Sequence, residues 1–150
     1  MLSDVILILR NSCRALLTSN APGQLAAGFT IGMIIGFVPK GNLIALSLCV
    51  LMFSLRCNKG IGLAAAVIFS FAGPWTDPLA HRLGFIVLNW HSGQATYASI
   101  FNLPLGPWLG LENTVVVGSL MMGLYVAYPV FWFTRLFFKT VWRLPAEAAV

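Results

Sequence analysis

The sequence has 150 residues, of which 59% are hydrophobic and 9% are charged, and its mean hydropathy is +0.87. Average soluble domains carry about a quarter charged residues, so this composition excludes a water-soluble surface and indicates a single-domain, all-α polytopic membrane protein. The net charge of +5 falls in short groups at the ends of apolar runs. Such grouping encodes membrane topology and argues against a nucleic-acid partner.

The first predicted element is an amphipathic helix over residues 3–19, whose apolar run is too short to span a membrane. Apolar residues recur there at helical spacing, while Asp4, Arg10 and Arg14 fall on the opposite side. This pattern is suited to a helix lying at the membrane interface with its arginines toward anionic headgroups. A secretory signal peptide is the alternative, but arginines interrupt the apolar stretch and no basic n-region precedes it.

A helical hairpin is predicted over residues 24–55. Its two apolar arms, of 15 and 14 residues, are separated by a Pro-Lys-Gly triplet in which Pro39 and Gly41 break the helix and Lys40 carries a charge. At 1.5 Å per residue each arm is about 21–23 Å long, which is shorter than the hydrocarbon core of about 30 Å. The hairpin is therefore expected to be re-entrant or short, and whether it fully spans stays open.

Residues 60–90 are predicted to cross the membrane once as a broken helix. Pro74 and Pro78 lie four residues apart, and two such prolines cannot sit inside one regular helix without freeing backbone carbonyl groups. At membrane depth an unwound backbone must be buried in protein or face a watery cavity. The pattern therefore predicts an unwound break from Pro74 to Pro78.

One conventional transmembrane helix is predicted over residues 114–134. The preceding residues 91–113 are polar and aromatic and contain no Lys or Arg, so they are expected to form a periplasmic loop. Residues 135–150 are expected to form a basic cytoplasmic tail. Basic residues also flank the first helix and the link at 56–59, which places both termini and this link in the cytoplasm.

Three glycines, Gly28, Gly32 and Gly36, form a stripe at four-residue spacing on the first arm of the hairpin. Small residues at this spacing allow two helix backbones to approach closely. The alternative is that the stripe leaves a smooth surface along which a lipid acyl chain could pass. Both readings, helix packing and lipid path, remain open at this level.

A polar cluster of Lys40, Asp77 and Arg82 is expected where the hairpin tip meets the broken helix. An unpaired Asp near the bilayer centre costs about 2.5–3.5 kcal/mol, so Asp77 needs partners. The alternatives are that these groups only satisfy one another and the broken backbone, or that Lys40 is a loop lysine reaching the headgroups. No catalytic, cofactor or metal site is predicted, because carboxylate pairs, metal-ligand spacing and nucleotide-binding motifs are missing. The protein is not expected to be an enzyme.

Several short motifs carry a resemblance to a known family. They are a Gly-Phe-x-x-Gly rhythm, a Phe-x-Pro turn and an Arg-x-Asn at the hairpin's end, and their residues are Gly28, Phe29, Gly32, Phe37, Pro39, Arg56 and Asn58. Over about residues 21–90 the chain resembles a small bacterial inner-membrane family known as domain of unknown function 2062. That family usually has Asn-Pro in the second break, where this sequence has Asp77-Pro78.

The resemblance implies a bacterial inner-membrane location and no established activity. Some relatives are similar to proteins encoded beside AsmA-like envelope proteins, which are thought to bridge two membranes and carry phospholipid. The resulting hypothesis is a component of phospholipid or amphiphile transport that works with an AsmA-like partner. The alternatives are a structural membrane anchor without a transport path and a small solute transporter working as a homo-oligomer.

Overall fold

The computed structural model describes residues 21–147, with side chains described through residue 140. In chain order the elements are α2 (Pro22–Phe37), α3 (Leu43–Ser54), α4 (Lys59–Leu88), the 3-10 turn η1 (His91–Gly93), α5 (Gln94–Phe101), the 3-10 turn η2 (Gly106–Leu109) and α6 (Thr114–Glu147). The all-α class is thereby confirmed for this part of the chain. The interfacial helix expected at 3–19 lies outside the described residues.

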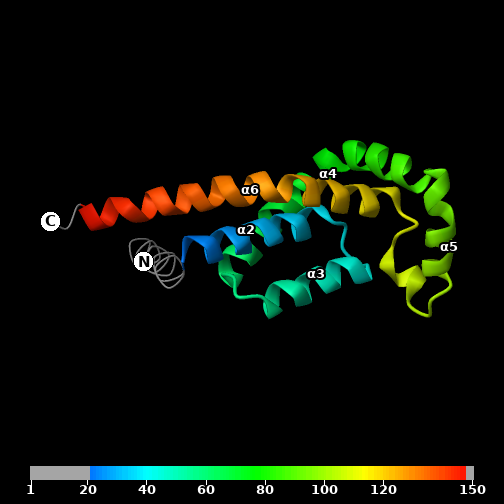
Figure 1. Cartoon of the computed structure of the whole chain (residues 1–150), viewed down its shortest axis with the longest axis horizontal. Coiled ribbons are helices and arrows are strands. Elements are labelled where there is room, and N and C mark those ends of the chain that lie inside the picture. Colours follow the sequence, from blue (N-terminus) through cyan, green and yellow to red (C-terminus); the bar gives the residue numbers. More distant parts are fainter. Residues whose placement is uncertain (1–20, 148–150) are drawn as a thin grey trace, which may run out of the picture.

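Helices α2, α4 and α6 pack against one another and form the centre of the molecule (Figure 1). Helix α3 lies along the outside of this group and touches it lightly. In Figure 1, α2 and α4 run in one direction and α3 and α6 run in the opposite one. One end therefore carries the α2–α3 turn, α5 and η2, which we call the turn end. The other carries the α3–α4 link and the later part of α6, which we call the basic end.

Local sequence signals explain where the first helices begin and end. Pro22 stands in the first turn of α2, where its missing N–H costs nothing. Asn42 begins α3 by accepting a hydrogen bond at Oδ1 from the amide of Ala45 (2.8 Å), and its Nδ2 donates to the carbonyl of Pro39 (2.7 Å). Between the two helices, Gly41 has a φ of +91°, which a residue with a side chain rarely adopts.

The glycine stripe of α2 lies directly against the backbone of α4. A Cβ at Gly28 would clash with the carbonyl oxygen of Asn58, and one at Gly32 would clash with the carbonyl oxygen of Gly62. The amide of Asn58 also donates to the carbonyl of Gln24 at 3.0 Å. The structure thus uses this stripe for helix packing. The lipid-path alternative is wrong for these glycines in this arrangement, because α4 occupies the surface they leave.

A second close crossing joins α4 to α6 near the turn end. A Cβ at Gly84 would clash with the carbonyl oxygen of Thr114, and one at Gly118 would clash with the carbonyl oxygen of Ala80. Small residues on both helices therefore let the two backbones touch. The first half of α4 therefore packs closely on α2, and its later half packs closely on α6.

Helix α4 is continuous from Lys59 to Leu88, with Pro74 and Pro78 inside it. The predicted unwound break is therefore wrong. Prolines four residues apart remove their amide donors from one side of a helix, so the remaining backbone ladder can persist. Both prolines are exposed, and the crossings just described hold the helix on either side of them. The carbonyls of Ser70 and Pro74 are the two that lose their usual i+4 amide donor.

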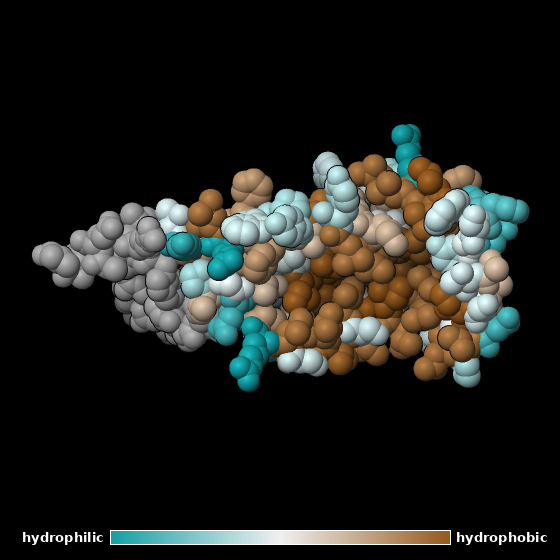
Figure 2. All heavy atoms as spheres, in the orientation of Figure 1, coloured by the Kyte–Doolittle hydropathy of each residue, from teal (hydrophilic) through white to brown (hydrophobic). Residues whose placement is uncertain are grey.

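Large apolar side chains cover the outside of the molecule. Helix α3 buries only Ala45 and Met52 among its residues, while Phe71, Trp75 and Tyr125 are 77%, 88% and 86% exposed. On the face shown in Figure 2, hydrophobic residues cover the middle and most hydrophilic residues gather toward the two ends. A contiguous apolar surface of this kind is unusual for a soluble monomer.

Helix α6 contains a segment, Thr114–Thr140, that is long and apolar enough to cross a membrane by its length and composition. The span predicted over residues 114–134 lies within it. The helix does not end there, however, but continues to Glu147, so most of the predicted tail is helical. Helices α2 and α3 are apolar and shorter, at 16 and 12 residues, which agrees with the predicted short hairpin.

Candidate functional site

The candidate site is built around Lys40, in the turn between α2 and α3. Its ammonium donates hydrogen bonds to the carbonyl oxygens of Ile35 (2.6 Å), Gly36 (3.1 Å) and Val38 (2.8 Å). The last carbonyls of a helix lack amide donors and carry a partial negative charge, so a cation is stabilised there. Lys40 thus folds back onto its own helix. Partial desolvation in this turn lowers the pKa of Lys40 below its usual value.

A cavity of about 210 Å³ lies between this turn and the middle of α4. Lys40 and Pro39 line it from the turn, and Ser70, Pro74 and Asp77 line it from α4. Ser70 donates from its hydroxyl to the carbonyl of Ala66 (2.6 Å). Ser70 and Pro74 are also the residues whose carbonyls lost their usual amide donors, but most of the cavity surface is apolar, and Lys40 and Asp77 are its charged residues.

The structure brings two members of the expected polar cluster onto this one cavity. Lys40 and Asp77 both line it, but no ion pair joins them. Asp77 is half-buried, whereas Arg82 is exposed on α4 and does not line the cavity. His81, four residues after Asp77, instead contacts Thr114 on α6. Its Nδ1 lies 2.6 Å from the hydroxyl oxygen of Thr114. This contact between α4 and α6 was not foreseen from the sequence.

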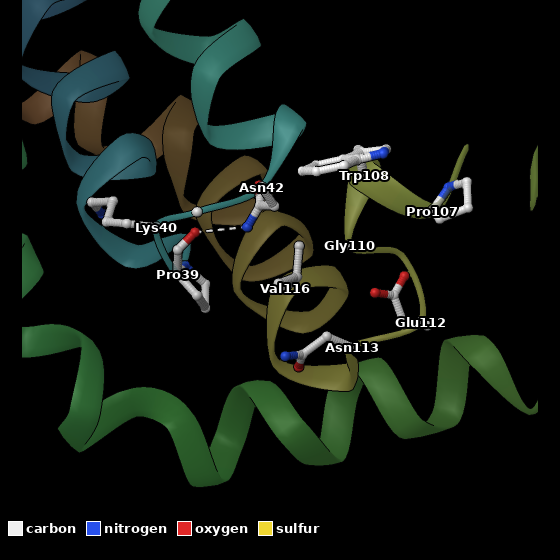
Figure 3. Close-up of a pocket in the computed structure, with 10 residues that line it drawn as sticks. Pro39, Lys40, Asn42, Pro107, Trp108, Gly110, Glu112, Asn113 and Val116 are labelled. Carbon is white, nitrogen blue, oxygen red and sulfur yellow. Dashed lines mark hydrogen bonds between the residues drawn. The ribbon is translucent and has the colours of Figure 1, made fainter. Parts of the chain in front are cut away.

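A second cavity, of about 320 Å³, lies on the other side of the turn (Figure 3). Its wall combines an indole, a carboxylate and two amides, from Trp108 of η2, Glu112, Asn113 and Asn42. Figure 3 shows the Lys40 side chain extending away from Glu112, toward its own helix. The two cavities share Pro39 and Lys40, so the turn separates a cavity lined by several polar side chains from one that is mostly apolar.

The loop before α6, residues 107–113, forms one wall of this second cavity and lies close to the α2–α3 turn. Gly110 has a φ of +73°, and a Cβ there would lie 3.0 Å from the Cβ of Asn42. Nearby, Val38, Ala45 and Val116 form a small buried cluster that fixes the turn to the start of α6. The sequence offered little sign of this site, because its walls come from segments about 70 residues apart.

The described residues that line the two cavities are of kinds that bind polar groups. Acidic, amide, indole and ammonium groups line the cavities, an arrangement that can recognise a polar headgroup. Among the described residues, no group of three His, Cys, Asp or Glu side chains could hold a metal ion. Cys49 and Cys57 are free thiols, and the Cys57 thiol donates to the carbonyl of Met52 at 3.3 Å.

Comparison with known proteins extends the resemblance noted in the sequence. The family described as "Uncharacterized protein conserved in bacteria (DUF2062)" matches residues 8–145. A protein of Treponema pallidum (strain Nichols), described as "Uncharacterized protein", is 26% identical over 122 residues, covering 81% of this chain and 75% of that protein. No solved structure matches the chain. The similarity therefore spans nearly the whole sequence, from the first expected helix into α6.

Proposed function

This chain belongs to the bacterial family DUF2062, and we propose that it is a multi-pass inner-membrane protein that handles a phospholipid or related amphiphile. In this proposal it works beside a periplasm-spanning partner of the AsmA-like type. Both termini and the α3–α4 link lie in the cytoplasm, and the turn end faces the periplasm. The charge distribution supports this orientation, because Arg56, Lys59, Arg135 and Lys139 all belong to the basic end.

The packing of α2 along α6 supports a hairpin whose first arm and turn reach across the membrane. The start of α2 and Leu136 line one cavity, and Val38, just before the α2–α3 turn, packs in one cluster with Val116. Leu136 and Val116 are 20 positions apart on α6, which corresponds to about 30 Å at 1.5 Å per residue. That matches the hydrocarbon core of about 30 Å. Lys40 would then lie at headgroup level and not at the bilayer centre.

The observation that carries the amphiphile proposal is the pair of cavities at the turn end, one lined by several polar groups and one mostly apolar, next to an apolar outer surface. Asp77 and Glu112 supply acceptors, Trp108 supplies an amphipathic ring, and the exposed helices beside them are apolar. An amphiphile has a polar headgroup and an apolar part, so it needs a polar site and an apolar surface side by side at the same depth in the membrane. A periplasmic partner could receive such a molecule directly from this end.

The test is a reconstitution in vesicles with a fluorescent phospholipid, followed by dithionite quenching to measure movement between leaflets. We expect the wild-type chain, with or without its envelope partner, to accelerate movement. Trp108→Ala and Glu112→Gln should each reduce that rate, while Ser47→Ala, on the exposed side of α3, should not. Unchanged rates in both cavity variants would contradict the proposal.

A structural anchor is the second candidate, and one observation favours it. The glycine stripe that might have lined an acyl path is closed by α4. An anchor would co-purify with the AsmA-like partner and stabilise it, yet it would not accelerate lipid movement alone or in complex. The vesicle assay therefore separates the two candidates.

A further inference from the structure

A cavity of about 540 Å³ lies at the basic end, on the opposite side of the molecule from the candidate site. The first residues of α2, Ala21–Gly23, form one wall. Trp132, Arg135 and Lys139 line the other, with Leu136 between them on α6. Residues three and four apart lie on one face of a helix, so the indole and both cations point to the same side of α6.

The two cations of this cavity have no counter-charge among the described side chains. The carboxylates among the described side chains, Asp77 and Glu112, line the cavities of the turn end, and within residues 21–140 no ion pair involves Arg135 or Lys139. The guanidinium of Arg135 lies 5.7 Å from the centre of the Trp132 ring, which holds it over the indole. A concave surface with two positive charges that no described carboxylate compensates favours an anion.

Two further features specify what kind of anion would fit. The N-terminal end of α2 has no side-chain cap, so its dipole adds to the positive potential of the cavity. The remaining wall is almost entirely apolar, from Pro22, Leu136 and the Trp132 ring. A small free anion would leave this apolar wall uncovered, whereas the phosphate of a lipid would bring its own glycerol and acyl chains.

We propose that this cavity binds the headgroup phosphate of an anionic glycerophospholipid, with Arg135 and Lys139 as its direct ligands. The inference rests on the proposed membrane placement, which puts the basic end at the cytoplasmic headgroup level, but it does not rest on lipid transport. It assigns a defined lipid site to the leaflet opposite the candidate site.

The experiment is a titration of the purified full-length chain in a non-ionic detergent, followed by native mass spectrometry. The probes are phosphatidylglycerol and phosphatidylcholine with the same acyl chains. We expect one saturable phosphatidylglycerol per chain, bound more tightly than phosphatidylcholine. Because a charge-assisted hydrogen bond is lost, Arg135→Gln and Lys139→Gln should each weaken phosphatidylglycerol binding about tenfold. Arg56→Gln removes the same charge at the same end but outside the cavity, and it should change binding less than about twofold.

Three outcomes would overturn this inference. Equal weakening by Arg56→Gln would show that general surface charge attracts the lipid. Equal binding of the two lipids would show that the headgroup charge is not recognised. Displacement of phosphatidylglycerol by inorganic phosphate at the same concentration would identify a free-phosphate site. Each of these can occur while the vesicle assay still succeeds, so failure here is distinct from failure of the proposed transport.

Discussion

Lys40 and Asp77 line one cavity between the α2–α3 turn and the middle of α4, yet each has a different role there. The Lys40 ammonium is bound by the carbonyls of Ile35, Gly36 and Val38, so its positive charge serves the end of α2. Asp77 remains a half-buried acceptor on the opposite wall. The positive charge of Lys40, which interrupts the apolar hairpin, therefore serves to cap the C-terminal end of α2.

The first prediction concerns this cap. Lys40→Met should destabilise the folded protein by about 0.5–1 kcal/mol, because a cation at a helix C-terminus is lost. Asp77→Asn should change stability much less, since no ion pair is broken. Equilibrium unfolding in mixed micelles measures both. If the double change Lys40→Asp with Asp77→Lys restored what the single changes lost, the two residues would be paired after all.

The second prediction concerns the glycine stripe. Gly32→Val should destabilise the protein by about 1–3 kcal/mol or prevent folding, because its side chain would meet the carbonyl of Gly62. Gly23→Ala, on the same helix, is the matched control, since nothing lies within 4 Å of a Cβ there. Thermal unfolding of the two variants makes the comparison. Equal stability would mean that α2 and α4 do not pack as described.

The third prediction concerns the prolines of α4. Pro74→Ala supplies an amide that can bond to the carbonyl of Ser70, so it should raise stability by up to about 3 kcal/mol. Pro39→Ala, in the turn, gains no helical hydrogen bond and should bring no such increase. Thermal unfolding again gives the result. A Pro74→Ala variant that fails to fold while Pro39→Ala folds would favour an unwound segment at this position.

The fourth prediction concerns topology. In a background without native cysteines, Ser92→Cys and Lys40→Cys should both react with a membrane-impermeant maleimide on intact spheroplasts. Arg56→Cys should react only after the membrane is opened. This follows from the proposed orientation, with the turn end outside and the basic end inside. Protection of Lys40→Cys while Ser92→Cys reacts would indicate a re-entrant hairpin with its tip inside the membrane.

The hairpin could be read from the sequence because its signals are local. Pro22, Pro39 and Gly41 act on the residues beside them, and the predicted arms at 24–38 and 42–55 differ from α2 and α3 by one or two residues at each end. The cap by Lys40 was also encoded locally, as a lysine just beyond a helix C-terminus. The sequence alone does not distinguish this cap from a pairing of Lys40 with Asp77, which is why the expected polar cluster includes both residues.

The continuity of α4 could not be read in the same way. Proline carries a local cost, but the contacts that outweigh it are tertiary, between Gly62 and α2 on one side and between Gly84 and α6 on the other. The cavity at the basic end is equally hidden in the sequence. Its walls, Ala21–Gly23 and Trp132–Lys139, are more than 100 residues apart and meet only in the folded chain.

Helix α2 packs mainly on α4, although α3 comes between them in the sequence. This order has a consequence for synthesis. Gly28 and Gly36 find their partners only when Asn58 and Phe69, about 30 residues later in the chain, have been made, which takes about 1.5–7 s at 5–20 residues per second. During that interval the nascent hairpin presents a bare backbone groove and an apolar α3. The first arm of the hairpin therefore acquires its main packing partner only after α4 has been synthesised.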